Sequence, residues 1–196
     1  MLHNYPPLRF MSLNPQSDIR IVSVIQPPRV VLDSSALAVL TDFTHIPAAT
    51  IEPEALVDYA NDLMRWRGVR TFLVTEAGGK VAGILTATDV LGEKPLKFAI
   101  DNRVRHDEVR VLDIMTPRAL FEFLDYEEVR SASVGHVVAT LRHAGRQHIM
   151  VGERTQAGEC IRGIFSLSQI ARQLGVDLQP SNVAQSFSEI EAALSH

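Results

Sequence analysis

Two short segments of the sequence place a hydroxyl group three residues ahead of an oxygen acceptor: Thr86 precedes Asp89, and Ser166 precedes Gln169. Each pair follows an apolar, strand-like run and opens a helix-like run, so it stands where a helix begins. A carboxylate there can accept two neighbouring hydroxyl groups of a bound molecule, with bonds about twice as strong as those of a neutral acceptor. The same spacing is that of a capping box, in which both side chains bond to free backbone donors. The two interpretations are not exclusive, and both stay open.

The two segments belong to an internal repeat. Gly68 and Gly145 are 77 residues apart, whereas Thr86 and Ser166 are 80 residues apart. The offset changes by three between EAGGK in the first copy and ERTQAGEC in the second. A hairpin tip tolerates such an insertion without moving its strands, so the repeat survives it.

Each copy is predicted to contain a helix, a two-stranded hairpin and a second helix. The expected elements of the first copy are a helix that begins at Pro53 and ends at Gly68, strands at 71–75 and 81–85, and a helix from Thr86. Those of the second copy are a helix near 134–143, strands at 148–151 and 161–165, and a helix over 166–175. The order indicates two similar units in an α/β (α+β) fold.

The chain is predicted to have five parts: an N-terminal extension (1–38), a first repeat (39–101), a connection (102–110), a second repeat (111–175) and a C-terminal amphipathic helix (176–196). The extension is rich in proline, with one possible strand at 19–25. The C-terminal helix carries an apolar stripe, which would cover core or a partner surface: Val183, Phe187, Ile190 and Leu194.

Composition excludes several classes of protein. With 46% hydrophobic and 21% charged residues in 196, the chain is of the ordinary globular kind, and a net charge of −4 does not favour a nucleic-acid partner. The single cysteine, Cys160, excludes an internal disulfide framework and a multi-cysteine metal site. We see no export signal, no membrane-length apolar run and no catalytic or metal-ligand motif. We therefore expect a cytoplasmic protein that is not an enzyme and has no membrane partner.

Three motifs, in this order, resemble the tandem CBS-domain family, also called the Bateman module. They are GILTATD at 83–89, DIMTP at 113–117 and GIFSLSQ at 163–169. The resemblance covers about residues 39–175. It implies two CBS-type repeats packed as a pseudo-two-fold pair, with clefts that take an adenosine-containing ligand: AMP, ADP, ATP, NAD or S-adenosylmethionine. It also implies a homodimer and a regulatory role towards an unidentified protein partner.

The resemblance places Asp89 on the ribose of that ligand. The other candidates for ribose or phosphate are Thr86, Arg70, Thr116, Ser166, Gln169 and His148, and Gly83 would let a backbone approach closely. The apolar candidates for adenine are Ile46, Ala48, Ile51, Val74, Met115 and Pro117. Because Gln169 is neutral where the family has a carboxylate, we expect a weaker or empty second site. No metal and no cofactor are expected, other than the nucleotide as a regulatory ligand.

A second function from another class fits the same residues. A CBS pair that has lost its ligand would serve as a structural adaptor between proteins. The neutral Gln169 favours the adaptor, and the intact Asp89 opposes it.

Overall fold

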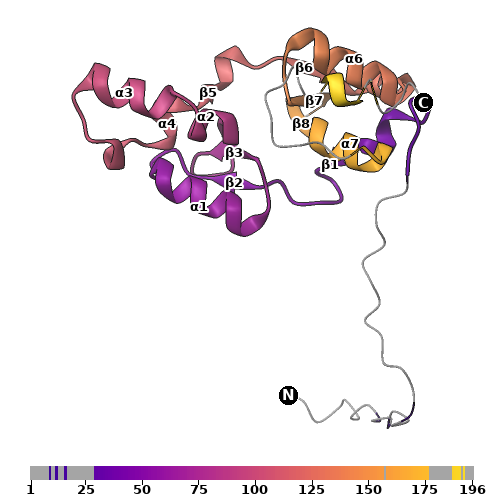
Figure 1. Cartoon of the computed structure of the whole chain (residues 1–196), viewed down its shortest axis with the longest axis horizontal. Coiled ribbons are helices and arrows are strands. Elements are labelled where there is room, and N and C mark those ends of the chain that lie inside the picture. Colours follow the sequence, from indigo (N-terminus) through magenta and orange to yellow (C-terminus); the bar gives the residue numbers. More distant parts are fainter. Residues whose placement is uncertain are drawn as a thin grey trace.

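The structure is a computed structural model of the chain. It describes residues 29–156, 158–176 and 187–190, together with the single residues 9, 12, 16 and 192. The possible strand at 19–25, Val183 and Leu194 lie outside the described residues. The described chain forms two lobes, the first purple to magenta and the second mainly orange in Figure 1.

Each lobe contains a four-stranded sheet built on a central antiparallel hairpin. The first sheet has the order β2 (Thr50–Ile51), β3 (Thr71–Thr75), β4 (Val81–Thr86) and β5 (Thr116–Pro117). The second has the order β6 (Phe123–Asp125), β7 (His148–Thr155), β8 (Gly158–Ser166) and β1 (Thr41–Asp42). In both sheets a parallel strand flanks the hairpin on one side and an antiparallel strand on the other. The predicted mixture of helices and small sheets, once per repeat, is confirmed.

Helices cover both sheets. Those of the first lobe are α1 (Val57–Arg67), α2 (Ala87–Leu91), α3 (Lys94–Asn102) and α4 (Val111–Ile114). Those of the second are α5 (Tyr126–Ser131), α6 (Val134–Ala144) and α7 (Leu167–Leu174). Both α1 and α6 end where predicted, at Gly68 (φ 65°) and Gly145 (φ 62°), because glycine enters the left-handed region without steric cost. None of the described helices combines the length and apolarity needed to span a lipid bilayer.

The segment ahead of each repeat packs on the other repeat. Val30, Ala36 and Val39 lie in the hydrophobic core of the second lobe, and residues 32–36 form backbone hydrogen bonds with 132–135. In the same way, residues 109–114 enter the core of the first lobe and bond to 53–57. The short strands follow this exchange, since β1 pairs with β8 and β5 pairs with β4. Each lobe therefore includes the segment that precedes the repeat of the other lobe.

Two glycines make the added strands possible. A Cβ atom on Gly163 would lie 2.5 Å from the carbonyl oxygen of Thr41, and one on Gly83 would lie 2.9 Å from that of Thr116. Both distances are far inside van der Waals contact, so a side chain at either position would push the added strand away. The backbone that approaches Gly83 is thus β5.

Arg162 helps to hold strand β1 in the sheet of the second lobe. The guanidinium of Arg162 on β8 donates to both carboxylate oxygens of Asp42 at 3.0–3.2 Å and to Glu153 at 2.9 Å. It also lies 4.5 Å from the ring centroid of Tyr126. These groups are mostly buried, and Arg162 holds the pKa of the Asp42 carboxyl well below its usual range. The network joins three segments that are distant in sequence.

Several boundaries differ from those predicted. Helix α1 begins at Val57, because residues 53–57 form backbone hydrogen bonds with 109–112. The three inserted residues lengthen the second hairpin, whose pairing continues to Thr155 and Gly158. A further helix, α3, forms over Lys94–Asn102 at the end of the first repeat, where none was predicted. In the C-terminal stripe, Phe187 and Ile190 are buried in the second lobe's core, so they cover core and not a partner.

Candidate ligand-binding cleft between the repeats

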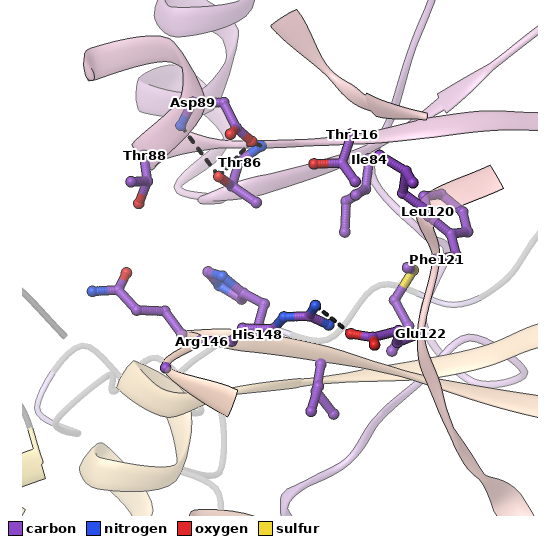
Figure 2. A pocket seen from close by; sticks show the side chains of 14 residues that line it. Ile84, Thr86, Thr88, Asp89, Thr116, Leu120, Phe121, Glu122, Arg146 and His148 are labelled. Carbon is purple, nitrogen blue, oxygen red and sulfur yellow. Dashed lines mark hydrogen bonds and ion pairs between the residues drawn. The ribbon is translucent and has the colours of Figure 1, made fainter. Parts of the chain in front are cut away.

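A cavity of about 270 Å³ lies between the two lobes, close to the roughly 300–1,000 Å³ that is usual for small-ligand sites. Figure 2 shows it from close by, with first-lobe residues above and second-lobe residues below. The first lobe and the segment after it contribute Ile84, Thr86, Thr88, Asp89, Thr116, Leu120, Phe121 and Glu122. The second lobe contributes Gly145, Arg146, Gln147, His148, Ile149 and Met150. A ligand in this cavity would contact both repeats.

The carboxylate of Asp89 is held at the cavity wall by the start of α2. Its Oδ2 accepts from the backbone N–H of Thr86 at 2.8 Å and from the Thr86 hydroxyl at 2.7 Å, while the Asp89 N–H donates back to that hydroxyl at 3.3 Å. Its Oδ1 accepts from Lys94 Nζ at 2.6 Å. The side chain is only 11% exposed. The capping box is therefore formed, and because Asp89 also lines the cavity, its contact with a ligand stays a prediction.

The second pair behaves differently, and the capping box expected from its sequence does not form. Gln169 Oε1 accepts from the hydroxyl of Thr41 at 2.9 Å, and Ser166 Oγ lies 3.0 Å from Ser168 Oγ. Strand β1, which pairs with β8, places the Thr41 hydroxyl beside Gln169. Neither Ser166 nor Gln169 lines the cavity of Asp89.

Thr116 occupies the place in the first lobe that Thr41 occupies in the second. Thr116 pairs with Ile84 on β4, and Thr41 pairs with Ile164 on β8, at matching positions of the repeat. The described residues give the Thr116 hydroxyl no hydrogen-bond partner, and Figure 2 shows its side chain at the cavity. This hydroxyl is therefore available to a ligand beside Asp89.

Two basic side chains face Asp89 from the second lobe. Arg146 forms an ion pair with Glu122, and both groups are well exposed. His148 is half-buried at the start of β7, and burial together with the nearby charge of Arg70 lowers its pKa to about 4. His148 is thus neutral at pH 7, where it offers one donor and one acceptor to a ligand, whereas Arg146 supplies the positive charge.

The lowered pKa of His148 predicts a pH dependence of stability. In the unfolded chain an imidazole takes up a proton near pH 6.5, and in the folded chain His148 takes it up only near pH 4. The unfolded state binds more protons between these values, so this contribution to stability is lost as the pH falls from about 6.5 towards 4. In His148→Gln, the free energy of unfolding measured by urea denaturation should change less steeply with pH between about 4 and 6.5 than in the wild type. The lowered pKa of His148 would be contradicted if this variant kept the pH dependence of the wild type. It would also be contradicted if replacing the exposed His143 by Gln weakened the pH dependence equally.

The structure brings together four of the predicted polar residues at the cavity: Thr86, Asp89, Thr116 and His148. Of the others, Gly83 is buried against β5, and Arg70 is exposed at the foot of β3, where its charge reaches His148. None of the predicted adenine contacts lines this cavity. Ile51 and Val74 lie in the first lobe's core, Met115 packs against that core, Pro117 lies on β5, and Ile46 and Ala48 lie between β1 and β2.

Other residues form the apolar and charged walls and were not predicted. The apolar walls are Ile84, Leu120, Phe121, Ile149 and Met150, and the additional polar groups are Thr88, Glu122, Arg146 and Gln147. The wall residues that come from the second lobe are 146–150, which follow Gly145 at the turn from α6 into β7. That turn is visible in the sequence, but nothing in the pattern indicates that it faces Asp89.

Comparisons with known proteins agree with this architecture. A family model described as "CBS domain" matches residues 40–95. No curated protein sequence matches the chain. Among solved structures, an uncharacterized conserved protein from Pyrococcus horikoshii is similar, with a TM-score of 0.54, 20% identity, and coverage of 78% of this chain and 100% of that one.

A second similar structure is CBSX2 in complex with AMP, with a TM-score of 0.50, 18% identity, and coverage of 71% of this chain and 94% of that one. CBSX2 from Arabidopsis thaliana, described as a CBS-pair protein, was also matched at a TM-score of 0.48, with 17% identity and coverage of 71% and 92%. The family model identifies the first repeat, and the fold shows the same unit twice. Residues 40–95 therefore match a CBS domain, and the described chain shares the fold of these solved structures.

Proposed function

We propose that this protein is a regulatory module that binds an adenosine-containing ligand in the cleft between its two repeats. The observation that carries the proposal is the buried carboxylate of Asp89 at the wall of a cavity that both repeats line. Support also comes from CBSX2, a protein of the same fold that was solved with AMP. The ligand acts as a signal, and the proposal assigns no reaction to the site.

The cavity walls match the three parts of such a ligand. Ribose hydroxyls would donate to Asp89, with Thr116 as a neighbouring partner. The adenine ring would lie against the apolar residues, of which Phe121 and Ile149 come from different segments. A phosphate would bind Arg146, whose pair with Glu122 is exposed and therefore weak enough to exchange. A neutral His148 would add a hydrogen bond.

Regulation would follow from the position of the site. Because the ligand contacts both lobes, it binds most tightly to one arrangement of them and shifts the population towards that arrangement. A partner protein that distinguishes the arrangements would then respond to ligand concentration, and by linkage the partner would change ligand affinity equally.

Calorimetric or thermal-shift titration with AMP, ADP, ATP, NAD and S-adenosylmethionine tests the proposal. A ligand present at 100 times its dissociation constant stabilises the folded state by about 2.7 kcal/mol, or roughly 5–11 °C for a chain of this size. We expect such a shift with at least one of the five. No shift and no heat of binding with any of them would exclude the proposed function.

A homodimer is proposed as the working assembly. Helix α1 exposes two aromatic side chains, Tyr59 and Trp66, which are 57% and 83% exposed and lie seven residues apart on one side of the helix. Burying these two side chains against a second copy would remove their apolar area from water. Analytical ultracentrifugation should find a dimer for the wild type and a monomer for Trp66→Glu. Identical sedimentation of the two would exclude this interface.

The adaptor remains the second candidate, and one observation favours it. The carboxylate of Asp89 already accepts three hydrogen bonds within the first lobe, which suffices for a purely structural role. An adaptor would form the dimer without responding to any of the five ligands.

A further inference from the structure

Lys94 occupies the carboxylate that the proposed ligand needs. Its ammonium group lies 2.6 Å from Asp89 Oδ1 and 3.3 Å from the backbone carbonyl of Ile114. The Lys94 side chain is 51% exposed, whereas that of Asp89 is almost fully buried. The cation thus reaches from solvent onto a buried anion.

The remaining capacity of Asp89 is too small for two ribose hydroxyls. An ionised carboxylate offers about four lone-pair sites. The backbone N–H and the hydroxyl of Thr86 take both sites of Oδ2, and Lys94 takes one site of Oδ1. One site is left, so a second hydroxyl can bind only if one of the present donors leaves.

Lys94 is the donor that leaves at the lowest cost. Its half-exposed ammonium group can return to water while the methylene stem stays in place. Releasing Thr86 would instead leave the backbone N–H at the start of α2 without its acceptor, which costs more than returning an ammonium group to water. The second repeat agrees with this pairing, because the residue five positions after the neutral Gln169 is Leu174 and carries no charge.

We propose that Lys94 is an intramolecular competitor of the ligand, which gives up its bond to Asp89 when ribose binds. This inference rests on the proposed function and adds a regulatory residue to the same site. Lys94 is the first residue of α3, so its release changes the contacts at the beginning of that helix. Exposed Leu96 and Ile100 lie on α3, which thereby becomes the part of the first lobe most directly coupled to ligand occupancy.

The test compares adenosine and AMP binding to the wild type, Lys94→Met and Lys97→Met by isothermal titration calorimetry. Methionine keeps most of the apolar stem and removes the charge. Lys97 lies one turn further along α3, and the described part of the chain gives its side chain no ion pair, so it is the matched control. We expect adenosine to bind Lys94→Met about two- to tenfold more tightly than the wild type. This factor corresponds to the free energy of an ion pair that is partly open to solvent. Lys97→Met should bind like the wild type.

A second measurement follows adenosine affinity as a function of ionic strength, with each folded protein compared with itself. Adenosine is uncharged, whereas salt weakens the ion pair that it displaces. Raising the ionic strength from about 0.05 to 0.5 M should therefore tighten adenosine binding to the wild type and leave Lys94→Met unaffected. Equal or weaker adenosine binding in Lys94→Met, or the same salt response in both proteins, would overturn the role of Lys94 while the ligand site stands. If neither protein bound adenosine or AMP, the site itself would fail, and the competitor with it.

Discussion

Asp89→Asn is expected to weaken AMP binding about 100-fold, as measured by isothermal titration calorimetry. Two bonds from ribose hydroxyls to a charged acceptor contribute about 1.5–3 kcal/mol each, compared with about 0.5–1.5 kcal/mol for neutral partners. The amide oxygen of asparagine can still accept from the Thr86 N–H, so the start of α2 keeps its principal cap. The amide nitrogen, however, is a donor and cannot accept from a hydroxyl.

Asp113→Asn is the matched control for this substitution. Asp113 accepts from the backbone N–H of Arg110 at 2.8 Å at the start of α4, just as Asp89 accepts from Thr86. Asp113 does not line the cavity. Its replacement should leave AMP affinity unchanged, and a similar loss in both variants would mean that the effect of Asp89→Asn comes from the fold. Wild-type affinity in Asp89→Asn would exclude a ribose contact at this residue.

Arg162→Met is expected to lower the free energy of unfolding by about 2–4 kcal/mol, as measured by urea denaturation. The guanidinium is 20% exposed and bridges Asp42 and Glu153, so its removal leaves two partly buried carboxylates side by side without a cation. The contact with Tyr126 is lost as well. The strand β1 then keeps its short ladder of backbone bonds to β8 and the bond from Thr41 to Gln169.

The control for this prediction is Arg154→Met, on the neighbouring strand β7. Arg154 pairs with Glu159 at 3.4 Å, and both side chains are largely exposed, so we expect a change below about 1 kcal/mol. The difference between the wild type and Arg162→Met should also shrink as the pH falls below about 4, because Asp42 takes up a proton there in the unfolded chain, whereas Arg162 keeps it ionised in the folded wild type. Equal losses in the two variants would contradict a structural role for the network.

The parts of the fold that could be predicted from sequence are those with a local pattern. Helix α1 shows apolar periodicity and ends at Gly68, strands β3 and β4 are short apolar runs, and the second repeat shows the same pattern. Strands β1 and β5 have two residues each, too few to show a period. They exist because distant segments pair with them, which is a property of tertiary packing.

The same distinction applies to the site. Asp89 and Thr86 were identified because their spacing is a local motif at a helix start. Arg146 and Phe121 were not, because they reach the cavity only through the way the lobes pack. Val74 was expected at the ligand and lies in the core, since a strand that is apolar throughout does not reveal which of its faces is covered.

A crystal structure of the protein with AMP tests the central claim most directly. The account predicts AMP between the two lobes, with ribose hydroxyls within about 3.2 Å of the Asp89 carboxylate and the phosphate near Arg146. AMP bound away from Asp89, or an empty cleft in crystals grown at saturating AMP, would contradict it.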